Sequence, residues 1–147
     1  MTNDLFSLEG RVALVTGGSR GIGKMIAAGF LAQGAARVYI TARKAAACEE
    51  TAHALGAAHA GECIALPADV STLAGIDALT AQLVAREPRL DILVNNAGAA
   101  WGAEFAEFPD APYSSLMRAR RALPVSIRNE CMFPNYPRRS DARRRES

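Results

Sequence analysis

A glycine-rich turn between an apolar run and a helical pattern constrains this chain more than any other feature of its sequence. The apolar run, residues 12–15, has no polar alternation, which is typical of a strand buried on both faces of a parallel sheet. The turn carries Gly17, Gly21 and Gly23, whose missing Cβ atoms permit close approaches that other residues block. Backbone amides at the start of the next helix can therefore face an anion. The turn predicts a phosphate site, and a plain strand-to-helix connection is the alternative.

The apolar pattern after this turn alternates between the helical and the strand period. Residues 22–33 repeat apolar side chains at Ile22, Ile26 and Phe30, and Gly34 is expected to end that helix. The other expected elements are a strand at 36–41, a helix at 44–55 ending near Gly56, a strand at 62–66, a helix at 73–86 stopped by Pro88, and a strand at 90–94. Strands that alternate with helices favour an α/β fold with a parallel sheet.

The residues just past the expected strand at 36–41 bear on which nucleotide a phosphate site here would favour. A ribose diol favours a carboxylate at this place, whereas a 2′-phosphate favours a guanidinium. The chain has Thr41-Ala42-Arg43 there, with no Asp or Glu, and Arg20 in the glycine turn adds a second cation. These residues predict NADP rather than NAD. The alternative is that both arginines are ordinary solvated surface residues.

Length and composition set limits on the class of protein. Half of the 147 residues are apolar, which suits a single core. The first residues do not look like a signal peptide and no run is long enough to cross a bilayer, so we expect a cytoplasmic protein without membrane partners. Cys48, Cys63 and Cys131 are widely spaced and are expected to be reduced thiols. His53, His59 and Cys63 match no known ligand spacing, with turns expected at residues 56 and 61 between them, so we expect no metal site.

Two segments resemble the signatures of the short-chain dehydrogenase/reductase family. Residues 16–23, Thr-Gly-Gly-Ser-Arg-Gly-Ile-Gly, are similar to its cofactor loop, and Asn-Asn-Ala-Gly at residues 95–98 is similar to its second signature. The resemblance covers about residues 7–110 and is closest to the 3-oxoacyl-carrier-protein reductase branch, including the kind that serves rhamnolipid synthesis. It implies a Rossmann-type doubly wound sheet with strand order 3-2-1-4, and reduction of a 3-oxoacyl or similar ketone with NADPH.

The resemblance also implies which residues contact NADP. Ligands of such sheets lie beyond the carboxyl ends of the strands, where residues 17–23 and 95–98 would converge. The expected cofactor-binding residues are Gly17, Ser19, Arg20, Gly21, Ile22, Gly23, Arg43, Asp69, Val70, Asn96, Ala97 and Gly98. Asp69 and Val70 correspond to the adenine position, although Asp69 before Ser71 and Thr72 is also a normal helix entry, and both interpretations can hold. Asn95 is expected to bond backbone within the sheet.

The resemblance ends near residue 110, before the part of the family that carries its catalytic groups. Family members continue through an active-site Asn, a Ser and a Tyr-x-x-x-Lys motif. Tyr113 and Tyr136 both lack a lysine four positions later, and the only lysines, Lys24 and Lys44, lie in the cofactor half. We therefore expect a dinucleotide-binding domain at residues 1–110 and no catalytic residue in the chain.

Charge changes sign at the same place. Residues 1–110 hold 8 Lys and Arg against 12 Asp and Glu, whereas residues 111–147 hold 9 against 3, so the net charge changes from −4 to +6. The second segment is rich in Arg and Pro and is expected to be disordered. It is either an out-of-frame translation or an evolved basic extension. Nucleic-acid binding through the arginines is the weaker alternative to a solvated tail, because no aromatic residues interleave them.

Two functions remain open from the sequence. The chain is an NADP-dependent reductase by descent, or it is a noncatalytic NADP-binding fragment or partner of a full-length relative. The expected strand at 90–94 would also have an open apolar edge, which predicts oligomerisation. The alternative is that apolar residues within 111–133 cover that edge.

Overall fold

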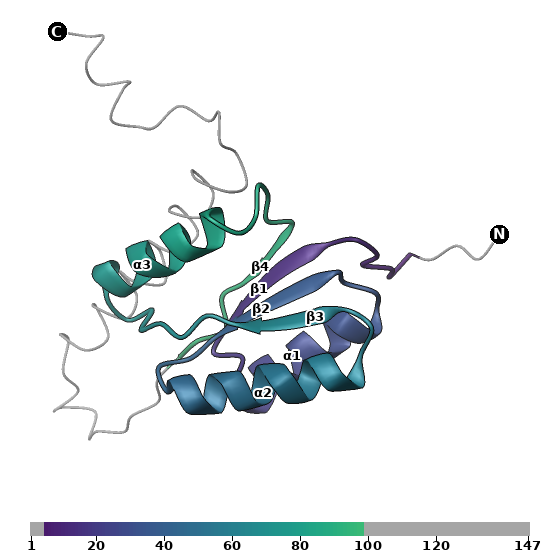
Figure 1. Cartoon of the computed structure of the whole chain (residues 1–147), viewed down its shortest axis with the longest axis horizontal. Coiled ribbons are helices and arrows are strands. Elements are labelled where there is room, and N and C mark those ends of the chain that lie inside the picture. Colours follow the sequence, from purple (N-terminus) through teal and green to yellow (C-terminus); the bar gives the residue numbers. More distant parts are fainter. Residues whose placement is uncertain (1–4, 99–147) are drawn as a thin grey trace, which may run out of the picture.

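A four-stranded parallel sheet with helices on both faces makes up the computed structural model, which describes residues 5–98 (Figure 1). The elements are β1 (Val12–Thr16), α1 (Gly21–Ala32), β2 (Arg37–Thr41), α2 (Ala45–Ala58), β3 (Glu62–Ala65), α3 (Leu73–Val84) and β4 (Ile92–Val94). The strand order is β3-β2-β1-β4, and all pairs are parallel. The predicted doubly wound fold and its strand order are confirmed. The expected tail at 111–147 lies outside the described residues.

The central strand β1 is buried along its whole length, as its unbroken apolar run predicts. It pairs with β2 on one side and with β4 on the other, so that Leu14 lies between Tyr39 and Leu93. The crossover from β3 to β4 passes over both inner strands, so the order reverses between β1 and β4. Ligands of open α/β sheets bind at such a reversal, beyond the carboxyl ends of the strands.

Alternating side chains of the strands build two cores. In Figure 1, α1 and α2 cover one face of the sheet and α3 covers the other. On the α1 and α2 side, the buried strand residues are Ala13, Val15, Val38 and Ile40. On the α3 side they are Val12, Leu14 and Tyr39, which pack with Ile76, Leu79 and Leu83 of α3. Val38 and Ile40 thus face one layer and Tyr39 the other, as the alternation of side chains along a strand requires.

The observed helix ends can be compared with the ends that the sequence predicts. Gly34 follows the end of α1 with a φ of +90°, which confirms the predicted stop. The predicted end of α2 near Gly56 is wrong, because Gly56 lies inside the helix, which runs on to Ala58. There is consequently no turn at Gly56 between His53 and Cys63. Helix α3 ends at Val84, but the Glu87 amide still donates to the Leu83 carbonyl oxygen at 2.9 Å, so helical bonding continues to the residue before Pro88, which has no amide hydrogen to extend it.

A buried carboxylate fastens the segment after α3 to β2. Glu87 is 3% exposed and accepts a hydrogen bond from the Tyr39 hydroxyl at 2.7 Å and one from Arg37 Nη2 at 2.9 Å. Burial, followed by the hydrogen bond to Glu87, raises the pKa of Tyr39 well above its ordinary range. Each oxygen of the buried Glu87 carboxylate thus has a hydrogen-bond partner, which is the condition for a buried charge to be tolerated. This network holds α3 against the sheet.

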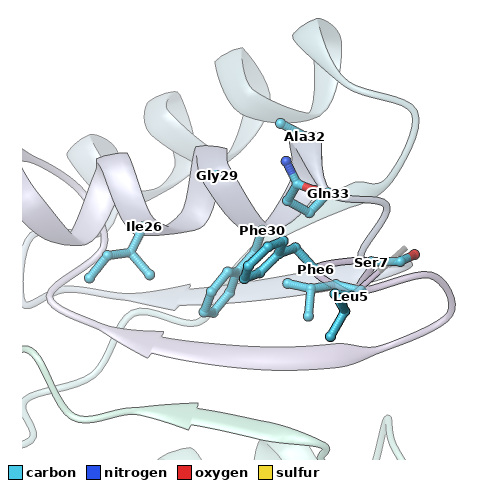
Figure 2. Close-up of a pocket in the computed structure, with 9 residues that line it drawn as sticks. Leu5, Phe6, Ser7, Ile26, Gly29, Phe30, Ala32 and Gln33 are labelled. Carbon is cyan, nitrogen blue, oxygen red and sulfur yellow. The ribbon is translucent and has the colours of Figure 1, made fainter. Parts of the chain in front are cut away.

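Two surfaces of the described part are less completely covered. The three residues of β4 are only half-buried, and within residues 5–98 no strand pairs with its outer edge. Helix α1 exposes Ile22 and Met25, and an apolar hollow of about 540 Å³ lies between its second half and residues 5–8. Figure 2 shows Phe6 and Phe30 in this hollow. Its lining comes from the carboxyl half of α1, so it is separate from the glycine turn.

No helix in the described range is long and apolar enough to span a membrane.

Candidate cofactor site

The glycine turn from β1 to α1 is anchored to the end of β2. Gly17 has a φ of +70°, a conformation that residues with a Cβ rarely adopt. The amides of Gly17 and Gly18 both donate to the Thr41 carbonyl oxygen, at 2.8 and 3.1 Å. On the other side of the turn, the Thr51 hydroxyl of α2 donates to the Ser19 carbonyl oxygen at 2.9 Å. The turn is therefore held in place from β2 and from α2.

Two glycines in this turn have opposite surroundings. A Cβ on Gly23 would collide with the Gly17 carbonyl oxygen and would lie 2.7 Å from Asn96 Nδ2, so close packing requires glycine there. A Cβ on Gly21 would meet nothing within 4 Å. Gly23 thus lets the helix start close to β1, and the space beside Gly21 is open to a ligand.

The amino end of α1 has the charge environment that an anion requires. Its first turn contains no acidic residue, and no side chain caps it. Arg20 stands at the N-cap position and is exposed, as is Ile22, the second residue of the helix. The helix dipole and the unpaired amides of the first turn attract negative charge. The residues present therefore fit a diphosphate.

The loop after β4 is fastened directly to β1. The Thr16 hydroxyl accepts hydrogen bonds from the amides of Asn96 at 3.0 Å and Ala97 at 2.9 Å, and donates to the Val94 carbonyl oxygen at 3.3 Å. The Asn96 carboxamide donates to the carbonyl oxygens of Thr16 at 3.0 Å and Gly17 at 3.4 Å. These bonds bring Asn96, Ala97 and the exposed Gly98 beside the glycine turn.

The sequence interpretation did not anticipate how this junction is built. The sequence assigns a backbone-bonding role to Asn95, which stays a prediction, and assigns none to Asn96, whose side chain makes two such bonds. It also passed over Thr16, the buried residue that connects both loops. A hydroxyl residue placed at the end of an otherwise apolar strand, immediately before a glycine, was the available signal.

The ends of β2 and β3 carry the remaining predicted residues. Arg43 is exposed just past β2. Asp69, past β3, accepts hydrogen bonds from the Ser71 amide at 3.0 Å and the Ser71 hydroxyl at 2.6 Å. The hydrogen bonds from Ser71, with a further contribution from the charge of Arg43, hold the pKa of Asp69 below its usual value. Val70 is half-buried and packs on the core under α3.

The residues considered for a metal site do not meet. Within residues 5–98, no three His, Cys, Asp or Glu side chains come together in a way that could hold a metal ion. His59 Nδ1 lies 2.9 Å from the Leu55 carbonyl oxygen at the end of α2. Cys63 is half-buried in β3, and burial raises its pKa to about 11. This thiol is therefore protonated at neutral pH.

Comparison with known proteins agrees with this geometry. The rhamnolipids biosynthesis 3-oxoacyl-[acyl-carrier-protein] reductase of Pseudomonas aeruginosa is 54% identical over 113 residues, which are 77% of this chain and 43% of the relative. The 5-keto-D-gluconate 5-reductase of Escherichia coli is 35% identical over 117 residues, covering 78% of this chain and 44% of the relative. The chain thus spans less than half the length of these relatives.

Solved structures show the same architecture. The Pseudomonas aeruginosa RhlG/NADP active-site complex matches with a TM-score of 0.73 and 49% identity, covering 85% of this chain and 48% of that one. The L-sorbose reductase of Gluconobacter frateurii, complexed with NADPH and L-sorbose, matches with a TM-score of 0.76 and 30% identity, covering 85% and 47%. The family model for short chain dehydrogenases matches residues 11–120. This chain is therefore a member of the short-chain dehydrogenase/reductase family of oxidoreductases.

Proposed function

We propose that residues 5–98 form a binding site for NADP(H). The observation that carries the proposal is the junction built by Thr16 and Asn96, which joins the turn at 17–23 to the loop at 95–98 around the open amino end of α1. One surface can thereby contact both the diphosphate and the nicotinamide half of a dinucleotide. Relatives with this fold are described as NADP or NADPH complexes, which supports the same cofactor here.

Under this proposal, each group of residues has a defined part. Gly17, Ser19, Gly21, Ile22 and Gly23 approach the diphosphate with their backbone at the start of α1. Asp69 and Val70 lie at the adenine, and Asn96, Ala97 and Gly98 line the ribose and nicotinamide. Arg20 and Arg43, both exposed, hold the 2′-phosphate.

The bound cofactor would supply a hydride for a ketone such as a 3-oxoacyl thioester, the substrate class that the Pseudomonas aeruginosa relative's name indicates. Ketone reduction also requires a proton donor. The family resemblance implies a Tyr-x-x-x-Lys motif. The 147-residue sequence contains no Tyr four residues before a Lys. We therefore propose that this chain binds the cofactor and does not itself reduce a ketone.

Replacing Arg43 with Asp tests the proposal. The carboxylate can accept hydrogen bonds from a ribose diol and repels a 2′-phosphate, so the ratio of NADPH to NADH affinity should fall at least tenfold. Isothermal titration calorimetry with both nucleotides measures that ratio. The matched control is Arg86→Asp on the exposed segment after α3, which should leave the ratio unchanged. Equal ratios in Arg43→Asp and the unmodified chain would contradict the assignment of Arg43.

A further inference from the structure

The backbone keeps Arg43 and Asp69 side by side at the edge of the sheet. Strands β2 and β3 pair in register up to Ile40 and Ala65. Beyond that point the Leu66 amide donates to the Ile40 carbonyl oxygen at 2.9 Å, and the Ala68 amide donates to the Ala42 carbonyl oxygen at 3.1 Å. Arg43 and Asp69 are the next residues on these two segments, so the sheet itself fixes them as neighbours.

The carboxylate of this pair is positioned independently of any cofactor. Its Oδ1 atom accepts two hydrogen bonds from Ser71, at 2.6 and 3.0 Å, which close the turn that leads into α3. These bonds favour the ionised form of Asp69. The Arg43 guanidinium, by contrast, lies outside ion-pair distance of Asp69 and forms no ion pair within the described part of the chain. A fixed negative charge thus stands beside an exposed positive one.

We propose that Asp69 weakens the preference for NADP over NAD by competing with the 2′-phosphate for Arg43, an inference that rests on the proposed function. The guanidinium is attracted to the carboxylate and to the phosphate, and cannot approach both as closely as either alone. NAD has a hydroxyl at this position, so its affinity does not depend on how Arg43 is shared. Asp69 is therefore a specificity-determining residue in addition to its place at the adenine.

The test is Asp69→Asn in the full chain, measured by calorimetry with NADPH and NADH at about 20 mM salt. Asparagine retains an oxygen that can accept both Ser71 hydrogen bonds, so the turn is preserved while the charge is removed. The ratio of NADPH to NADH affinity should rise about two- to fivefold, and the rise should shrink at about 0.5 M salt, where screening is strong. Any loss of an adenine contact lowers both affinities equally and leaves the ratio unchanged.

Two controls separate the route through Arg43 from other effects. Glu9→Gln removes one negative charge from the exposed amino end of β1, at the opposite end of the sheet, and should leave the ratio as it is. In an Arg43→Ala background, Asp69→Asn should change the ratio less than about 1.5-fold, because the shared cation is gone.

The outcomes are distinct. An unchanged ratio in Asp69→Asn, or a rise that persists in the Arg43→Ala background, would overturn the inference and leave NADP binding intact. If the unmodified chain bound neither nucleotide, the proposed function and this inference would both be overturned. Far-ultraviolet circular dichroism and the melting temperature of each variant show that the fold is retained.

Discussion

Thr16 shows how much of the proposed cofactor site can depend on one buried side chain. Its hydroxyl is fully buried and serves two backbone amides and one carbonyl of the loop after β4. An amide that loses its acceptor in a buried place costs about 1–3 kcal/mol. The Thr16 hydroxyl of β1 therefore stabilises the position of the loop that carries Asn96.

Replacing Thr16 with Val should test that dependence. Valine has nearly the same shape, so the change removes the hydroxyl that accepts from the Ala97 amide and leaves the Asn96 amide with the Val94 carbonyl oxygen, at 3.1 Å, as its acceptor. We expect a loss of about 1–3 kcal/mol in the free energy of unfolding and at least tenfold weaker NADPH binding. Thr80→Val is the matched control, because the buried Thr80 hydroxyl donates only to the Ile76 carbonyl oxygen of its own helix, at 2.9 Å. Equal effects of the two substitutions on NADPH affinity would contradict this role.

Asp91 should make the stability of the fold depend on pH. Its carboxylate accepts a hydrogen bond from the Val12 amide at 3.0 Å and lies near Arg89 and Arg11, all of which hold its pKa below the ordinary value. Because the folded-state pKa is depressed, the stabilisation is complete above the unfolded pKa of about 3.9 and is lost as the pH falls through the folded value.

The measurement is the melting temperature between about pH 6 and pH 2.5. The decline at acid pH should be shallower in Asp91→Asn than in the unmodified chain. Asp77→Asn on the exposed side of α3 removes the same charge and should follow the unmodified curve. Parallel curves for Asp91→Asn and the unmodified chain would show that Asp91 does not stabilise the fold.

Two of the three glycines in helix α1, Gly23 and Gly29, have opposite steric surroundings, so substituting each makes a matched pair. Gly29 lies inside the helix, is exposed, and would give an added Cβ nothing to meet within 4 Å. Gly29→Ala should therefore raise the free energy of unfolding by about 0.5–1 kcal/mol, the helix propensity difference. Gly23→Ala should destabilise strongly, since its Cβ meets the Gly17 carbonyl oxygen. Urea denaturation measures both, and a loss of stability in Gly29→Ala would show that this face of α1 is covered in solution.

The helices and strands also show what could be predicted from the sequence. The order of elements follows from the spacing of apolar residues, which has one period in strands and another in helices. This spacing belongs to the sequence itself, so β1 and α1 could be predicted. The end of α2 could not be predicted, because Gly56 lowers helix propensity by only about 1 kcal/mol and the tertiary structure outweighs it. Residues 95 and 96 are both asparagine, so the sequence does not distinguish them. The direction of each side chain decides that Asn96 bonds Thr16 and Gly17. That direction is a tertiary property.

The 147-residue chain should bind cofactor without turning over a ketone. Loss of a single positioned acid typically costs about 10²- to 10⁴-fold in rate, and the 147 residues hold no Tyr-x-x-x-Lys motif. Oxidation of NADPH with a 3-oxoacyl thioester should therefore be at background. The control is the Pseudomonas aeruginosa reductase that is 54% identical over the shared part. Turnover within roughly tenfold of that control would contradict the prediction, with Tyr113 and Tyr136 the first residues to replace.

The outer edge of β4 affects how the whole molecule could associate. Ile92, Leu93 and Val94 are half-buried, and within the described range only β1 pairs with this strand. An apolar strand with an unpaired edge tends to recruit another strand. Association through this edge remains a prediction, and so does the alternative that residues 111–133 cover it.

The bonds between Thr16 and Asn96 join residues that are 80 positions apart in the sequence. The proposed cofactor surface therefore forms only when β4, the last strand of the described residues, has joined the sheet, however early the glycine turn itself is made. A growing chain would acquire affinity for the dinucleotide late, because contacts between distant residues form slowly. Nucleotide binding would then report that β4 has joined the sheet, which binding to a site built within one continuous segment could not do.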